Sequence, residues 1–142
     1  MYDCLSASAS SVILADQLLL RAAVFAFLGR YRGQTRIHTE SDLRVFLRWC
    51  TDQNLDPLAA ARVDVERYVR WLQDVRWYQP STVSRRLSVV VGFYRVCVID
   101  AILEHSPADY VRPRTTMRYD RARKNLDRHP NYILAAYMAS GT

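Results

Sequence analysis

Apolar residues recur at every third or fourth position between residues 83 and 98, and this seam is the strongest constraint on the fold. The period predicts one long amphipathic helix. Pro80 suits the first turn of that helix, because its fixed φ angle is helical and no N–H is needed there. The apolar seam consists of Val83, Leu87, Val90, Val91, Tyr94 and Val98. A polar seam beside it holds Ser81, Arg85, Ser88, Gly92 and Arg95.

Three other segments have the helical period. The first covers residues 16–31 and ends among glycines. The second begins near Thr39, an N-cap with Asp42 three residues on, and ends at 54–57. The third covers about residues 64–75, with an aspartate as its cap. Since no segment alternates as a strand does and no repeat is found, the sequence predicts an all-α fold.

The stretch "HSPADYVRPR" contains Pro107 and Pro113, which disfavour helix before them. It predicts a turn and an extended exit from the helical part. We therefore expect a flexible N-terminus over 1–15, a helical domain over 16–114 and a tail over 115–142. The tail begins basic and ends in "NYILAAYMAS", a short helix candidate.

The formal net charge of +6 and a pI of about 9.5 favour polyanionic partners, with nucleic acid first and anionic membrane second. Lys124 is the only lysine, so arginine carries nearly all the positive charge. A GC-rich genome explains such a ratio equally well. The arginine excess alone therefore does not identify the partner.

The cysteines and histidines point to no metal or disulfide chemistry. Cys4, Cys50 and Cys97 are far apart, no C-x-x-C pair exists, and the three histidines are scattered. The apolar N-terminal stretch lacks a basic start and is interrupted by Asp16. It fits neither a signal peptide nor a membrane span. We expect a cytoplasmic protein with reduced thiols, no cofactor and no metal.

Arginines and short hydroxyl side chains gather on the second and fourth predicted helices and the loop before the second. Arginine neutralises phosphate, and hydroxyls and helix N-termini hydrogen-bond to phosphate oxygens. The alternatives are a solvated charged surface or a membrane or protein partner. The predicted DNA-binding residues are Arg36, Thr39, Arg44, Arg48, Ser81, Thr82, Arg85, Arg86 and Arg95.

Aromatic residues are absent from this basic set. Interleaved aromatics are what single strands need for stacking, so a duplex is the favoured nucleic acid. Trp71, Trp77 and Tyr78 belong to another helix end. We expect them to lie mostly in the core or at its rim.

The order of these segments resembles the N-terminal, SAM-like core-binding domain of tyrosine recombinases and phage integrases. The matching features are Thr39 followed by Leu43, Phe46 and Trp49, the helix "PSTVSRRLSVVVGFY", and the exit "SPADYVRPR". The resemblance covers roughly residues 18–114. It implies a four- to five-helix bundle that clamps one face of duplex DNA, with its second and fourth helices toward the groove.

The tail sequence "TTMRYDRARKNLDRHP" is similar to the C-terminus of integrases from high-GC bacteria, in which such a segment carries the nucleophilic tyrosine. On that resemblance Tyr119 occupies the nucleophile position. The chain has no H-x-x-R box, and its only lysine follows the tyrosine. Strand exchange needs a clamp of donors for the developing phosphate charge and a proton donor for the leaving hydroxyl. Tyr119 is therefore expected to be a vestigial nucleophile.

The favoured hypothesis is a truncated, catalytically inactive tyrosine recombinase or integrase that still binds double-stranded DNA. In a second hypothesis, Tyr119 acts in trans inside an active site completed by an intact recombinase. In a third, the bundle or the last helix is a protein-interaction or dimerisation module, with an intact recombinase or a second copy as partner.

Overall fold

The computed structural model describes residues 16–114, and these residues form an all-α bundle, as the sequence predicts. An N-terminal helix (residues 16–28) is followed by α2 (Gly33–Asp52), the short 3₁₀ helix η1 (Pro57–Ala59), α3 (Arg62–Arg70), the π-helical turn η2 (Trp71–Val75) and α4 (Pro80–Ile99). No residue between 16 and 114 lies in a strand. The predicted N-terminal segment and tail, with Tyr119, lie outside the described residues.

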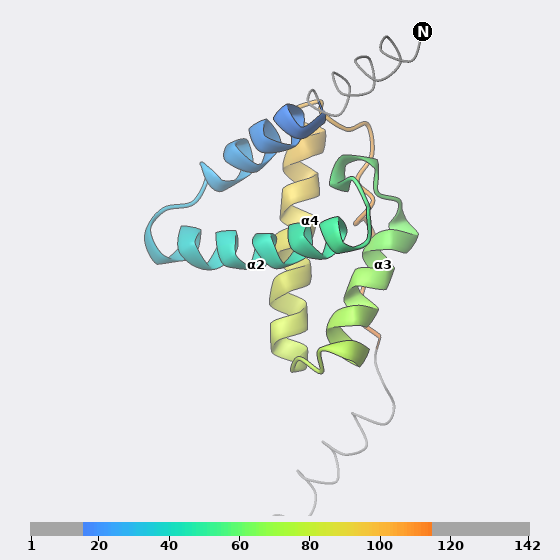
Figure 1. The fold of residues 1–142 in the computed structure, drawn as a ribbon. Helices are drawn as coiled ribbons and strands as arrows, with labels where there is room; N and C mark the ends of the chain where they lie inside the picture. Colours follow the sequence, from blue (N-terminus) through green and yellow to red (C-terminus); the bar gives the residue numbers. More distant parts are fainter. Residues whose placement is uncertain (1–15, 115–142) are drawn as a thin grey trace, which may run out of the picture.

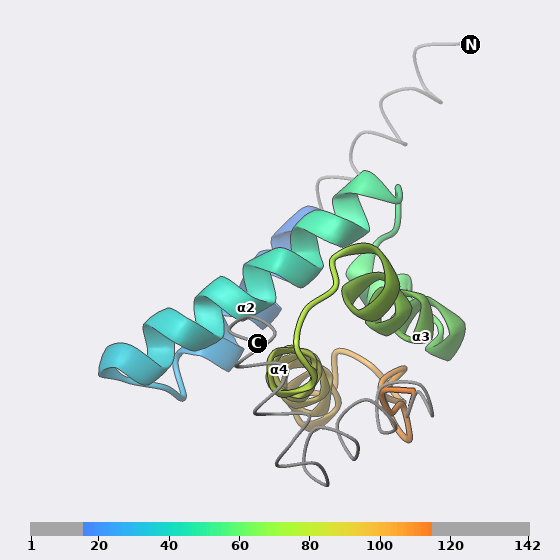
Figure 2. The ribbon, with the colours of Figure 1, turned by 90° about the horizontal axis from the view of Figure 1, so that it is seen from below.

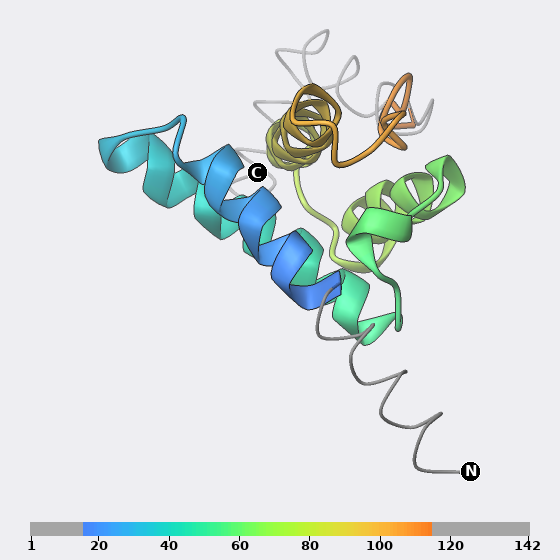
Figure 3. The same ribbon diagram turned by 90° about the horizontal axis from the view of Figure 1, so that it is seen from above.

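Two helical units pack around α4: the hairpin of the N-terminal helix with α2, and the continuous segment of α3 with η2. The N-terminal helix and α2 form a hairpin that crosses α4 steeply, and α3 with η2 runs beside α4 on another side (Figure 1). The views along α4 place the exit segment, residues 101–114, on the side of α3 and α4 that faces away from α2 (Figures 2 and 3). The α2 side and the α3 side of the molecule are therefore separate surfaces.

α4 agrees with the sequence prediction. It begins with Pro80 in its first turn and ends at Ile99. Val83, Leu87, Val90 and Tyr94 of the predicted seam are buried, and the Tyr94 hydroxyl donates a hydrogen bond to the Pro57 carbonyl at 2.7 Å. This bond anchors η1 to the core, because a buried hydroxyl without a partner would cost free energy.

α2 begins earlier than predicted. Its first residue is Gly33, whose φ of +61° allows the chain to reverse after the N-terminal helix. Thr39 lies inside the helix and is buried, so the prediction that it is the N-cap is wrong. No side chain caps α2, and its start therefore leaves no capping signal in the sequence.

α3 begins two residues before the predicted cap. Asp64 sits in the first turn and accepts a hydrogen bond from the Ala61 N–H at 2.9 Å, so it satisfies a free donor from inside the helix. The helical segment then continues through η2 to Val75, where the sequence predicts its end.

The core is rich in aromatic side chains that meet edge to face. Phe46 lies at the centre, with ring centroids 4.8 Å from Tyr68 and 6.0 Å from Tyr94, and Phe27 contacts Phe93 at 5.8 Å. Such pairs add to the stabilisation from burial by about 0.5–1.5 kcal/mol each. All four helices thus contribute rings or aliphatic side chains to one core.

The described part shows neither a membrane span nor a metal site. None of its helices is long and apolar enough to cross a bilayer. Within residues 16–114, no group of three His, Cys, Asp or Glu side chains is placed to hold a metal ion.

We expect the two buried thiols to be unreactive in the folded protein. Burial raises the pKa of Cys50 to about 12 and that of Cys97 to about 11, which leaves almost no thiolate at neutral pH. In a Cys4→Ser background, a thiol reagent at pH 8 should label neither cysteine until denaturant is added. Rapid labelling of either thiol without denaturant would show that the core opens.

Candidate nucleic-acid interface

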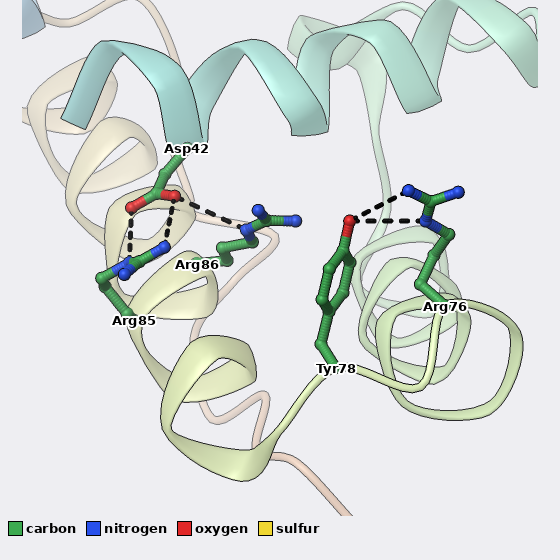
Figure 4. Close-up of polar contacts among 5 residues, drawn as sticks. All are labelled: Asp42, Arg76, Tyr78, Arg85 and Arg86. Atoms are coloured by element: carbon green, nitrogen blue, oxygen red, sulfur yellow. Dashed lines mark hydrogen bonds and ion pairs between the residues drawn. The ribbon is translucent and has the colours of Figure 1, made fainter. Parts of the chain in front are cut away.

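The most buried charged side chain of the described residues is Asp42 of α2, at 3% exposure. Arg85 of α4 donates to both of its carboxylate oxygens, from Nε at 2.9 Å and from Nη2 at 3.2 Å. Arg86 adds an ion pair, with Nε 3.5 Å from Oδ1. One carboxylate of α2 therefore holds two consecutive arginines of α4 (Figure 4).

The two arginines differ in what remains available to a ligand. The Arg85 side chain is 57% exposed, and its two bonds to Asp42 leave three of its five N–H donors. The Arg86 side chain is only 15% exposed and lies over the Tyr78 ring, with its guanidinium carbon 4.2 Å from the ring centroid. Arg85 therefore keeps donors at the surface while it is bound to Asp42, whereas the Arg86 guanidinium is largely covered by Asp42 and Tyr78.

The polar contacts continue from Arg86 to the linker before α4. Arg76 donates to the Tyr78 hydroxyl from Nη2 at 3.2 Å, on the side of Tyr78 away from Asp42 (Figure 4). The hydrogen bond from Arg76, and then the neighbouring Arg86, lower the pKa of the Tyr78 phenol. This series of cations and aromatic groups fixes the linker between η2 and α4.

The arginines of α2 lie outside this network. Arg36, Arg44 and Arg48 are exposed. Arg44 pairs with Glu40 at 3.1 Å on the surface, and within residues 16–114 no ion pair holds Arg36 or Arg48. A rise of 1.5 Å per residue puts Arg36 and Arg48 about 18 Å apart along the helix, so α2 presents cations along most of its length.

The N-terminus of α4 is also open to an anion. No acidic residue lies in its first turn, and within residues 16–114 no side chain caps it. Ser81 is exposed and Thr82 half-buried. Free N–H groups at a helix start, with hydroxyls beside them, suit a phosphate oxygen.

The other predicted residues are placed differently. The polar seam of α4 is interrupted at Gly92, where a Cβ atom would lie 3.4 Å from the Phe27 ring, so the N-terminal helix covers this part of α4. Arg95 is exposed but lies about 15 Å along α4 from Arg85, on the far side of the contact that the N-terminal helix makes at Gly92. Thr39 is buried in the core face of α2 and is not available to a ligand there. Sequence periodicity missed the burial of Thr39 and the covering of Arg86, because the groups that cover them come from other parts of the chain.

A second set of arginines lies on the α3 side. Arg70, Arg112 and Arg114 line a shallow groove of about 280 Å³ with Tyr110 and Gln73. The Gln73 side-chain amide donates to the Arg114 carbonyl at 3.0 Å and accepts from its N–H at 3.3 Å, and Arg114 pairs with Asp74 at 2.7 Å. These contacts fix the exit segment to η2, and Arg114 is engaged by the protein itself.

By fold, the chain is an all-α bundle of the kind expected of a SAM-like core-binding domain. Residues 25–98 match the family described as phage integrase, N-terminal SAM-like domain. This match covers more than half of the chain, and the chain belongs to this family.

A curated relative is tyrosine recombinase XerD of Chlorobaculum tepidum, which is 22% identical over 89 residues. The alignment covers 63% of this chain and 29% of the relative, so the chain spans less than a third of that protein. No solved structure gives a significant match. The family and the relative place the chain in the tyrosine recombinase lineage.

We expect Asp42→Ala to lower the free energy of unfolding by about 3 kcal/mol, because it leaves the largely covered Arg86 guanidinium without a charged partner. Thermal or denaturant unfolding followed by circular dichroism measures the change. Asp52→Ala is the matched control, since Asp52 is an exposed aspartate of the same helix without an ion pair in the described part. Equal stability of the two variants would contradict a structural role for Asp42.

Proposed function

We propose that the chain binds duplex DNA through α2 and the N-terminal end of α4. The observation that carries this proposal is the position of the exposed cations: the arginines on the surface of α2 and the open start of α4 lie on the two elements joined by Asp42 and Arg85. The family match supports a nucleic-acid partner, because its description and that of the relative refer to an integrase and a recombinase.

The proposed contacts are of two kinds. Arg36, Arg44 and Arg48 neutralise phosphates along α2, and the surface pair of Arg44 with Glu40 is weak enough to be displaced. Arg85 and Ser81 meet the backbone at the start of α4, where Asp42 holds the Arg85 guanidinium in one orientation. A side chain that is already ordered loses less entropy on binding.

Phosphate contacts give affinity rather than sequence information. One small bundle neutralises few phosphates, so the binding should be weak, strongly dependent on salt and only modestly selective for sequence. We propose that Arg95 contributes little to DNA binding, because the contact of the N-terminal helix at Gly92 separates it from the start of α4. Thr39 and Arg86 are not proposed as contacts, because Thr39 is buried and the Arg86 side chain is only 15% exposed.

We expect Arg44→Ala/Arg48→Ala to weaken duplex binding about tenfold at low salt. Each lost phosphate contact should also reduce the slope of log K against log salt by about 0.9. Fluorescence anisotropy of a labelled duplex across a salt series measures both quantities.

The matched control is Arg62→Ala/Arg70→Ala, which removes the same charge from the exposed surface of α3. It should leave the slope within error of the unmodified chain. Absence of binding at low salt would refute DNA binding altogether. A larger effect of the α3 variant would instead locate the DNA on the groove beside the exit segment.

We also propose that the chain does not carry out strand exchange by itself. The sequence contains no H-x-x-R box and no lysine before Tyr119, so the phosphate clamp and the proton donor of the resembled family are missing from it. Loss of one such electrostatic donor already costs about 10²–10³ in rate.

A nicked duplex trapped with the purified chain should therefore give no covalent protein–DNA adduct on a denaturing gel. The same assay with a catalytically competent recombinase added tests whether Tyr119 is used in trans. An adduct of the chain alone that disappears in Tyr119→Phe would show that the proposal of inactivity is wrong.

A further inference from the structure

The linker between η2 and α4 exposes a tryptophan. Trp77 is 82% exposed, whereas Trp49 is buried and Trp71 packs against the core. The sequence interpretation expects Trp77 in the core or at its rim, and the structure places it on the surface. Single exposed apolar side chains are common on protein surfaces, but Trp77 is, together with Tyr110, the most exposed large apolar side chain of the described residues.

Trp77 is held out by its backbone. Its φ is +55°, a left-handed backbone conformation that residues other than glycine rarely adopt. The residues on both sides are fixed: the Arg76 N–H donates to the Trp71 carbonyl at 3.0 Å and the Tyr78 N–H to the Leu72 carbonyl at 3.1 Å. The strained conformation is therefore imposed by the structure around it, and such residues cluster at ligand sites.

The neighbours of Trp77 along the chain are suited to an anion. Arg76 precedes it, and α4 begins three residues later with no acidic residue and no side-chain cap in its first turn. The nearby carboxylate of Asp74 pairs with Arg114 at 2.7 Å. In chain order, the exposed Trp77 thus stands between the exposed Arg76, whose guanidinium bonds to the Tyr78 hydroxyl, and the start of α4.

The apolar surface here is small. Within the linker and η2, only Val75 joins Trp77 as an exposed large apolar side chain. A stable protein interface buries about 800 Å² on each partner, which two side chains do not supply. A partner that combines anionic groups with small apolar surfaces fits better, and the DNA backbone, with a deoxyribose between successive phosphates, is such a partner.

We propose that Trp77 packs against deoxyribose of the duplex strand whose phosphate is bound at the N-terminus of α4. The inference rests on the proposed DNA-binding function and extends it from charged contacts to an apolar one. In this proposal, a residue of the linker, rather than a residue on a helix face, sets how closely α4 approaches the DNA backbone.

Trp77→Ala should weaken duplex binding about five- to tenfold. The salt slope should stay unchanged, because no phosphate contact is lost. Tyr110→Ala is a closely matched control: Tyr110 is also 82% exposed with a left-handed φ of 63°, but it lies on the exit segment. Its affinity should equal that of the unmodified chain.

Tryptophan fluorescence gives a readout that does not depend on affinity. Acrylamide, a neutral quencher, should reach Trp77 in the free chain and lose access when saturating duplex is added. Trp77→Phe should remove most of the accessible signal and its change on DNA binding, while its melting temperature stays the same.

Each outcome has a separate meaning. Duplex binding with unchanged acrylamide access and an unaffected Trp77→Ala variant would overturn the Trp77 contact and leave DNA binding intact. No duplex binding by any variant would overturn both. A Trp77→Ala variant that changes only the sedimentation of the chain would assign Trp77 to a protein contact and overturn the inference.

Discussion

The pairing of Asp42 with Arg85 and Arg86 is the interaction on which the arrangement of this domain depends. The Asp42 carboxylate is buried, and the cations that offset the cost of burying its charge come from another helix, more than 40 residues further on. Through Arg86 and Tyr78 the same contacts reach the linker before α4. One ion cluster therefore joins α2 to α4, in addition to the Phe46–Tyr94 contact of the core, and orients Arg85.

The sequence predicts the helices whose signals are local. The prediction of α4 is correct, because Pro80 marks the start of this helix and the apolar period continues to its end. The predicted start of α2 is wrong by six residues. The helix begins at a left-handed Gly33, and its N-cap residue makes no side-chain hydrogen bond that a sequence pattern could reveal. Asp64 is a helix-starting residue as predicted, but it acts from the first turn and so shifts the boundary.

For the proposed interface, the sequence predicts which helices carry the arginines but not which arginines are free. Arg44 and Arg48 lie on an exposed side of α2, as their spacing indicates. Arg85 and Arg86 are neighbours in the chain with similar composition around them, yet one is exposed and the other is covered by an aromatic ring. This difference depends on Asp42 and Tyr78, whose tertiary positions no local pattern reveals. The exposure of Trp77 escapes sequence reasoning for the same reason, because an aromatic residue beside apolar ones is usually buried.

The attachment of Arg114 to η2 has a mechanical consequence. Its backbone is bonded to the Gln73 side chain through both N–H and carbonyl, and its guanidinium to Asp74. Tension applied to the chain after residue 114 would therefore act first on the π-helical turn, only a few residues before the linker that carries Tyr78 and Trp77. The same turn carries the buried Leu72, and its Trp71 stacks on Tyr68, so the load would also reach the aromatic core. The exit segment and the linker before α4 are therefore mechanically coupled, because both are hydrogen-bonded to η2.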